Sequence, residues 1–348
     1  MINLLKANKM KKISILLASL IGVLTLMTSC NDEWKDEQYT HYVSFKAQLN
    51  DNGVTSVYVP YSRHNDDGSY MYGEEGLSSY DLPVIVSGST VNPSTIKVSI
   101  AHDTDTLGIL NYARFQSRKD LYYVDMNDYA EYPQNVTIEG GQSVGLFKIK
   151  FNFKGIDMVD KWVLPLTIVD DGVSPYLSHP RKNYAKAMLR VYPYNDYSGN
   201  YSATTLTLAN SEDLSNAIGM ETSRAYVVDE NTVFFYAGDI NEKRTDRVNY
   251  KIYAQFIGDS QGSVKLWSDN PAMKFTTDGK ASFRIYETMD EVQPYLKHRY
   301  VIINNISYSY VDYTSVKGTE MAYTAKGTLT LERKLNTQIP NEDQAIEW

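Results

Sequence analysis

Short segments of alternating polarity, separated by turn residues, constrain the fold of this chain more than any other feature. Alternating or continuously apolar stretches occupy residues 96–100, 146–153, 163–169, 248–256, 282–286, 300–313 and 328–331. A period of two residues places successive side chains on opposite faces of a sheet, so each stretch predicts a β-strand. Turn signals such as Asp170-Asp171-Gly172 and Asp278-Gly279 lie between them. The chain is therefore predicted to be all-β and built from sandwiches or barrels.

One segment, residues 211–219, predicts an α-helix. Ser211 is a suitable cap, acids follow in the first turn, and Gly219 closes the segment. A break is predicted near residues 193–199, where Tyr-Pro-Tyr-Asn-Asp-Tyr-Ser-Gly ends one series of strands before another begins. Because no internal repeat relates the two halves, we expect two different β-domains, residues 41–194 and 195–348.

The N-terminal segment has the three-part plan of a secretory signal. A lysine-rich start precedes an apolar run at residues 13–27, which ends in the small residues Thr28 and Ser29. The run is shorter than the ~20 residues of a membrane-spanning helix. The sole cysteine, Cys30, follows directly. This arrangement resembles the lipobox of bacterial lipoproteins, which implies a signal peptide at residues 1–29 and lipidation of Cys30.

Residues 30–40 form an acidic segment, with four acids between Asp32 and Glu37. Clustered like charges repel and stay solvated, so we expect a tether. The segment also resembles the acidic export signal of Bacteroidota-type lipoproteins, and both interpretations can hold together. The resemblance implies a protein that is lipid-anchored to the outer membrane and exposed at the cell surface. Two or more acyl chains are enough to hold a soluble domain stably on a membrane.

The charge balance argues against a nucleic-acid partner. The chain has 42 acidic and 34 basic residues, and its net charge is −8. Loss of the leading lysines with the signal would make it more negative. Nucleic acid and anionic membrane surfaces require the opposite sign.

No motif predicts catalysis, a metal or a cofactor. Gly141-Gln142-Ser143-Val144-Gly145 matches a serine-hydrolase elbow, but alternating residues follow it and predict a strand where the elbow needs a helix, so we interpret it as a hairpin turn. The histidines are scattered, and His102-Asp103-Thr104-Asp105 does not fit a calcium loop. Phosphate-binding and dinucleotide-binding glycine motifs are absent. A glycosidase that uses unrecognised carboxylates remains an alternative, since their spacing cannot be seen in sequence.

Two regions carry a resemblance to a known architecture. Residues 163–169, preceded by residues 136–143, resemble the N-terminal immunoglobulin-like domain of lipoproteins and glycosidases from glycan-utilisation loci. Ser198-Gly199-Asn200-Tyr201, residues 308–313 and the ending at residues 331–348 are similar to the lipocalin-like domain that follows it in those lipoproteins. The resemblance implies an immunoglobulin-like β-sandwich followed by a lipocalin-like β-barrel or sandwich. It also implies a surface protein that binds or handles glycans.

The chain contains 29 tyrosines and four tryptophans. An aromatic ring can lie against the C–H face of a sugar, although most tyrosines of a β-protein simply pack in strands. In residues 263–268, Trp267 falls on the face opposite Val264 and Leu266, so it is predicted to point outward. Tyr308 and Tyr310 share a face with Ile306 and are predicted to line a barrel interior or its mouth.

These patterns name four candidate glycan-binding residues: Trp267, Tyr308, Tyr310 and Tyr313. The sequence does not decide whether Trp348 is a docking plug or part of a frayed end. We favour a non-catalytic surface protein that binds glycan for a polysaccharide-utilisation system. A structural or assembly partner of an outer-membrane transport complex is the first alternative, and a glycosidase is the second.

Overall fold

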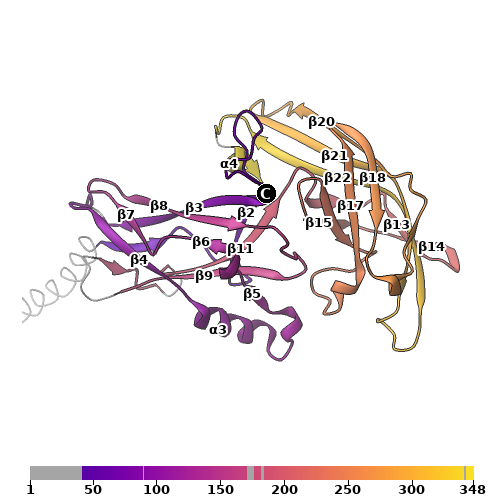
Figure 1. Cartoon of the computed structure of the whole chain (residues 1–348), viewed down its shortest axis with the longest axis horizontal. Coiled ribbons are helices and arrows are strands. Elements are labelled where there is room, and N and C mark those ends of the chain that lie inside the picture. Colours follow the sequence, from indigo (N-terminus) through magenta and orange to yellow (C-terminus); the bar gives the residue numbers. More distant parts are fainter. Residues whose placement is uncertain (1–40, 89, 171–175, 182–183, 341) are drawn as a thin grey trace, which may run out of the picture.

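A computed structural model describes residues 41–88, 90–170, 176–181, 184–340 and 342–348, and shows two β-domains side by side (Figure 1). The predicted signal peptide, Cys30 and the acidic tether lie outside the described residues. No helix in the described part of the chain has the length and apolar composition needed to cross a bilayer. The predicted all-β, two-domain fold is confirmed.

Two sheets form the N-terminal domain. The first has the order β10 (Leu177–Ser178), β1 (Tyr42–Phe45), β3 (Leu77–Ser87), β8 (Val144–Asn152), β6 (Ala130–Glu131). The second has the order β2 (Thr55–Pro60), β11 (Lys186–Tyr194), β9 (Lys161–Ile168), β4 (Ile96–His102), β7 (Asn135–Ile138), with β5 (Tyr123–Asp125) beside β9. The strict alternation of β8 buries Phe147, Ile149 and Phe151, whereas β9 is buried along nearly its whole length. The core therefore lies between the two sheets.

The C-terminal domain is one continuous sheet that closes on itself. Its order is β14 (Asp213–Gly219), β13 (Thr207–Asn210), β22 (Met321–Asn336), β12 (Gly199–Ser202), β15 (Thr222–Val227), β16 (Thr232–Tyr236), β17 (Lys251–Gly258), β18 (Gln261–Trp267), β20 (Ser282–Met289), β21 (Leu296–Asp312), β19 (Thr276–Thr277). Pairing of β21 with β22 closes the barrel, and β23 (Ile346–Glu347) adds to β22. Closure leaves β14 as a free edge, which projects at the right of Figure 1.

The long β21–β22 hairpin bends so that it can close the barrel. A bulge interrupts its register between Ile303 and Ile306, where Asn305 has a φ of 56°. On β22, Gly327 has a φ of 149°, and a Cβ at this position would collide with the carbonyl oxygen of Thr205. Only glycine lets the two segments approach so closely.

The predicted helix at residues 211–219 is wrong. Residues 213–219 form β14, which pairs with β13 from Thr207↔Gly219 to Asn210↔Asp213. All of β14 is exposed, including Leu214 and Ile218, so a helix here would have had no core to pack against. Pairing with β13 gives the same backbone its hydrogen bonds without burial.

Two other local predictions are corrected. Residues 248–250 of the predicted strand 248–256 belong instead to a 3-10 turn, η3 (Arg247–Tyr250), before β17. The turn predicted at residues 141–145 joins β7 to β8, but these two strands do not form a hairpin. β7 pairs with β4 in one sheet, and β8 pairs with β3 in the other. The remaining short helical elements are η1 (Lys119–Leu121), η2 (Asn127–Tyr129), η4 (Pro271–Met273) and α4 (Glu342–Ala345).

A helix that the sequence patterns did not predict, α3 (Thr104–Phe115), lies beneath the N-terminal domain in Figure 1. Asp103 caps it by accepting a hydrogen bond from the Thr106 N–H at 3.1 Å. The segment His102-Asp103-Thr104-Asp105 therefore contains the start of a helix.

The chain ends at the junction of the two domains (Figure 1). The Trp348 ring stacks on Tyr58 of β2 with centroids 4.1 Å apart and planes 4° apart, and it lies edge-on to Tyr194 of β11. Trp348 is thus docked against the N-terminal domain. Of the two possibilities left open by the sequence, a docking plug and a frayed end, the structure has the first.

Candidate functional site

A row of aromatic side chains crosses the outer face of the barrel. Tyr226, Phe234, Tyr253 and Trp267 come from β15, β16, β17 and β18, and each is the direct cross-strand partner of the next. Their ring centroids are 5.1, 6.3 and 5.1 Å apart in that order. Cross-strand aromatic pairs of this kind stabilise a sheet. They also place the four rings in one row that runs across the strands.

One end of this row is covered by the N-terminal domain. Tyr226 and Phe234 are 6% and 2% exposed, whereas Tyr253 and Trp267 are partly exposed. Beside the row, Lys251 of β17 forms an ion pair of 2.9 Å with Asp157 of the N-terminal domain. The accessible part is therefore the stacked pair of Tyr253 and Trp267, here named the aromatic platform, whose ring planes are 15° apart.

The sheet leaves one side of Trp267 open. β20 pairs with β18 only at Gln261–Ser263, so no residue of β20 is registered opposite Trp267. Two ammonium groups lie over the rings: Lys265 Nζ is 5.5 Å from the Trp267 ring centroid, and Lys251 Nζ is 5.5 Å from that of Tyr253. Stacking on Tyr253 covers one face of Trp267, so the other face and the nearby ammonium donors are the parts that can match a sugar ring, which has an apolar C–H face and peripheral hydroxyls.

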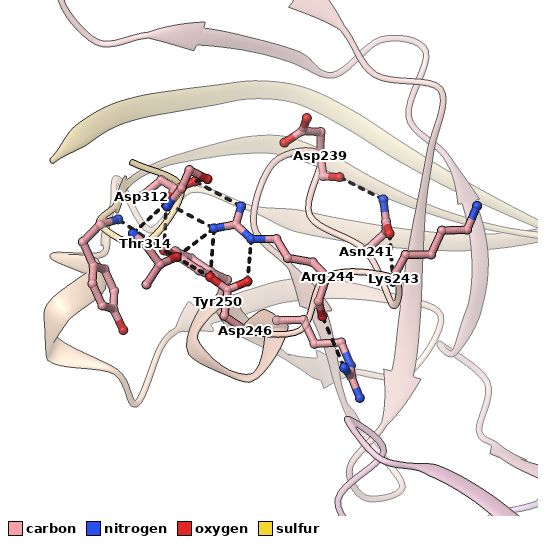
Figure 2. A network of polar contacts seen from close by, with 11 residues as sticks. Asp239, Asn241, Lys243, Arg244, Asp246, Tyr250, Asp312 and Thr314 are labelled. Atoms are coloured by element: carbon pink, nitrogen blue, oxygen red, sulfur yellow. Dashed lines mark hydrogen bonds and ion pairs between the residues drawn. The ribbon is translucent and has the colours of Figure 1, made fainter. Parts of the chain in front are cut away.

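A charged network fixes the end of the barrel at which β17 begins and β21 ends (Figure 2). The Arg244 guanidinium donates to Asp246 Oδ1 at 2.6 Å, to Asp312 Oδ2 at 3.1 Å and to Thr314 Oγ1 at 2.8 Å. Tyr250 Oη donates to Asp312 Oδ1 at 2.8 Å. Burial acts to raise the pKa of Asp312, yet hydrogen bonds from Arg244 and Ser315 hold it well below its usual range. The network therefore fixes the loop at residues 237–250 to the end of β21.

Tyr313 lies at this fixed end. Its N–H donates to Tyr250 Oη at 3.2 Å, and its own hydroxyl accepts from Asn270 Nδ2 at 2.9 Å. Asn270 follows β18 and also donates to the carbonyl of Asn249 at 2.7 Å. These bonds join the segment after Trp267 to the loops before β17 and after β21, so Tyr313 helps to fix the strand ends that carry the platform.

Tyr308 and Tyr310 are placed in the barrel interior, one of the two positions predicted for them. Each is 2% exposed, and Tyr308 Oη accepts from the Gly238 N–H at 3.1 Å. Burial raises the pKa of Tyr308 to about 12. A ring buried in this way has no face for a sugar, so the candidate site excludes both tyrosines. The outward position of Trp267 follows the predicted strand parity, since Val264 and Leu266 are buried on the other face.

Tyr253 is the residue that sequence reasoning missed. The same parity argument applies to it, because Ile252, Ala254 and Phe256 are buried and Tyr253 points the other way. Its pairing with Trp267 required the register of β17 against β18, which runs through the turn at residues 259–260. Within the described ranges, no group of three His, Cys, Asp or Glu side chains is arranged to hold a metal ion.

A second stacked pair lies elsewhere on the outer surface. Tyr286 of β20 and Tyr300 of β21 are cross-strand partners with centroids 5.0 Å apart. The Tyr300 hydroxyl donates to Glu332 at 3.1 Å, and His298 stacks on its ring at 6.1 Å. Tyr286 is 41% exposed and offers only a phenol ring, so this pair is a matched comparison for the platform.

Similar proteins place the chain in a family. An auxiliary nutrient binding protein from Bacteroides thetaiotaomicron is 50% identical, with a TM-score of 0.81 over 89% of this chain and 100% of that one. The chain belongs to the family of that protein. A Bacteroides ovatus member of unknown function is 43% identical, with a TM-score of 0.76 over 88% of this chain and 100% of its own. Another Bacteroides ovatus member, a multidomain protein including DUF1735, is 41% identical. Its TM-score is 0.75 over 88% of this chain and 100% of its own.

Family models match both domains of the chain. A domain of unknown function, DUF4973, matches residues 34–172. A model of a C-terminal domain matches residues 185–330. No curated protein matches the chain.

Proposed function

We propose that this protein binds glycan at the aromatic platform, as a non-catalytic nutrient-binding lipoprotein on the outer face of the outer membrane. The observation that carries the proposal is the stacked Tyr253–Trp267 pair, partly exposed at the end of an aromatic row, with the Lys251 and Lys265 ammonium groups over its rings. The nutrient binding of the Bacteroides thetaiotaomicron family member supports it.

The proposed mechanism is capture by many weak contacts. The Trp267 ring packs against the C–H face of one sugar, while the exposed Lys265 ammonium group donates to its hydroxyls. A single contact of this size is weak, but many anchored copies can engage one polymer and raise the overall avidity. The platform supplies a surface and donors, in contrast to the paired carboxylates of glycoside hydrolysis.

Affinity electrophoresis of the purified protein through gels that contain single polysaccharides tests this proposal. At least one polysaccharide should retard the protein. Trp267→Ala should weaken the retardation by about 30-fold in affinity, which corresponds to the loss of about 2 kcal/mol expected at a binding hot spot.

Tyr286→Ala is the matched control, because it removes a stacked outer-face ring from the same barrel. Retardation that survives Trp267→Ala unchanged would refute the platform. Absence of any retardation, together with co-purification with an outer-membrane transporter, would favour the assembly role. Release of reducing sugar would favour a glycosidase.

A further inference from the structure

A polar pocket of about 460 Å³ lies at the junction of the two domains. Its walls come from the ends of β2, β11, β21 and β22, from the linker after Tyr194 and from the turn between β15 and β16. The charged side chains that line it are Arg63, His64, Asp196, Glu230, Arg299 and Arg333. Pockets at domain junctions are common binding sites, and this volume suits a small ligand. None of its lining residues belongs to the aromatic platform.

Two of the arginines are forced together by strand register. Arg299 of β21 is the direct cross-strand partner of Arg333 of β22. Like charges placed directly opposite each other destabilise a sheet. Arg333 is 7% exposed, and burial together with the neighbouring charge of Arg299 lowers its pKa. The fold therefore carries an unfavourable pair of guanidinium groups at this pocket.

The arginines are held rigidly from behind. Arg333 Nη2 donates to the carbonyls of Asn195 at 3.0 Å and Ser198 at 2.9 Å, and its guanidinium lies 5.4 Å from the ring centroids of both Tyr194 and Trp348. From the other wall, Arg63 Nε and Nη2 donate to the carbonyl of Ser79. The two backbone carbonyls that accept from Arg333 do not cancel its positive charge, so this group is preorganised for an anion.

Acidic side chains offset this charge only in part. Asp196 Oδ2 forms an ion pair of 3.1 Å with Arg299 Nη2, and its side chain is 52% exposed. Glu230 Oε1 lies 3.9 Å from His64 Nε2, and among the residues that the structure describes neither this oxygen nor Arg299 Nε has a hydrogen-bond partner. The cross-strand pair of Arg299 and Arg333 thus lies beside the half-exposed carboxylate of Asp196, in a chain whose net charge is −8. An unpaired buried donor and acceptor mark a wall that hydroxyl groups can satisfy after small side-chain shifts.

We propose that the junction pocket binds an acidic monosaccharide unit, with its carboxylate at Arg299 and its hydroxyls toward Glu230. A planar guanidinium matches a planar carboxylate, and the pocket has room for a pyranose ring. The choice of a sugar as the body of the ligand rests on the proposed function, whereas the carboxylate follows from the arginines alone. The site acts independently of the aromatic platform.

Calorimetric titration of the full chain with D-galacturonate, D-galactose and acetate tests this site. These probes separate the carboxylate from the sugar ring. Galacturonate should bind at least about tenfold more tightly than either of the others, since a charge-assisted bidentate contact contributes about 1.4 kcal/mol or more. Equal binding of galacturonate and galactose, equal binding of galacturonate and acetate, or no binding of galacturonate would each overturn the proposal.

Two substitutions should move the affinity in opposite directions. Arg299→Gln should weaken galacturonate binding by about tenfold. Asp196→Asn should strengthen it by about threefold, because it removes the exposed carboxylate that competes for Arg299. Arg284→Gln is the control with the same charge change, since Arg284 is exposed on β20 outside the pocket.

A purely structural role for the arginines would make both pocket variants neutral or weaker, and weaker binding by Asp196→Asn would contradict the proposal. Trp267→Ala should leave galacturonate binding unchanged. Failure of this site and failure of the aromatic platform are therefore distinguishable.

Discussion

Glu242 lies at the contact between the two domains and is bound by groups from both. Its Oε2 forms an ion pair of 2.8 Å with Arg190 of β11, and its Oε1 accepts from the Tyr226 hydroxyl at 2.6 Å. Burial by itself would raise the pKa of Glu242, but the charge of Arg190 and the two hydrogen bonds outweigh burial and lower it to about 2. One carboxylate thus couples the barrel to the sandwich.

This coupling predicts a pH dependence of stability. Folding lowers the pKa of Glu242 from its ordinary value of 4.5 to about 2, so its contribution is complete above pH 4.5 and is lost as the pH falls toward 2. Glu242→Gln should destabilise the protein by about 3 kcal/mol at neutral pH, because it leaves Arg190 buried without its partner. Urea unfolding at several pH values should show the gap between wild type and variant closing below pH 4.5. A gap that stays constant would contradict this assignment.

At the scale of single residues, strand parity predicted which way a side chain points but not what covers it. Val264, Leu266 and Trp267 lie on the faces expected. Tyr308 and Tyr310 also point inward, yet the same pattern fits a ring at an open barrel mouth and a ring sealed in the core. The depth of a position along a barrel depends on strand stagger, which a single strand does not encode.

At the scale of elements, strands were predictable because each buries one face, whereas α3 and β14 were not. In α3 only Leu107 and Asn111 are buried, so the helix lacks the wide apolar stripe that a period of 3.6 residues reveals. Asn111 Nδ2 donates to the Tyr123 carbonyl at 2.9 Å, and its Oδ1 accepts from the Tyr123 N–H at 2.7 Å. A tertiary contact with β5 therefore holds a helix that its own sequence only weakly favours.

Asn111→Ala should accordingly destabilise the N-terminal domain by about 2 kcal/mol, because it leaves both backbone groups of Tyr123 buried and unpaired. Tyr112→Ala is the control, since Tyr112 is 72% exposed on the same helix. Thermal unfolding should separate the two variants clearly. Equal midpoints would mean that α3 is held by other contacts.

At the scale of the whole molecule, polar groups and rings join the two domains along their junction. Arg247 of the barrel is 3% exposed and donates to the Val159 carbonyl at 2.8 Å and to the Asp120 carbonyl at 3.2 Å. The docked Trp348 adds a ring contact with Tyr58. These contacts orient the platform and the junction pocket relative to each other, which the sequence could not predict because none of them is local.

The proposed anchoring at Cys30 is also a property of the whole molecule. Cys30→Ala should shift the protein from the membrane fraction to the soluble fraction, because the acyl chains supply the membrane affinity. Cell fractionation with radiolabelled palmitate checks this prediction, with the wild-type protein as the labelled control. Unchanged membrane retention of the unlabelled variant would contradict the proposed anchor.

The most direct test of glycan binding at the aromatic platform is the indole NMR spectrum of protein labelled with ¹⁵N at its four tryptophans. Replacement of each tryptophan by phenylalanine assigns the signals. On titration with a polysaccharide that retards the protein, the Trp267 signal should shift while those of Trp162 and Trp348 stay in place. Binding that leaves the Trp267 signal unmoved would contradict the account.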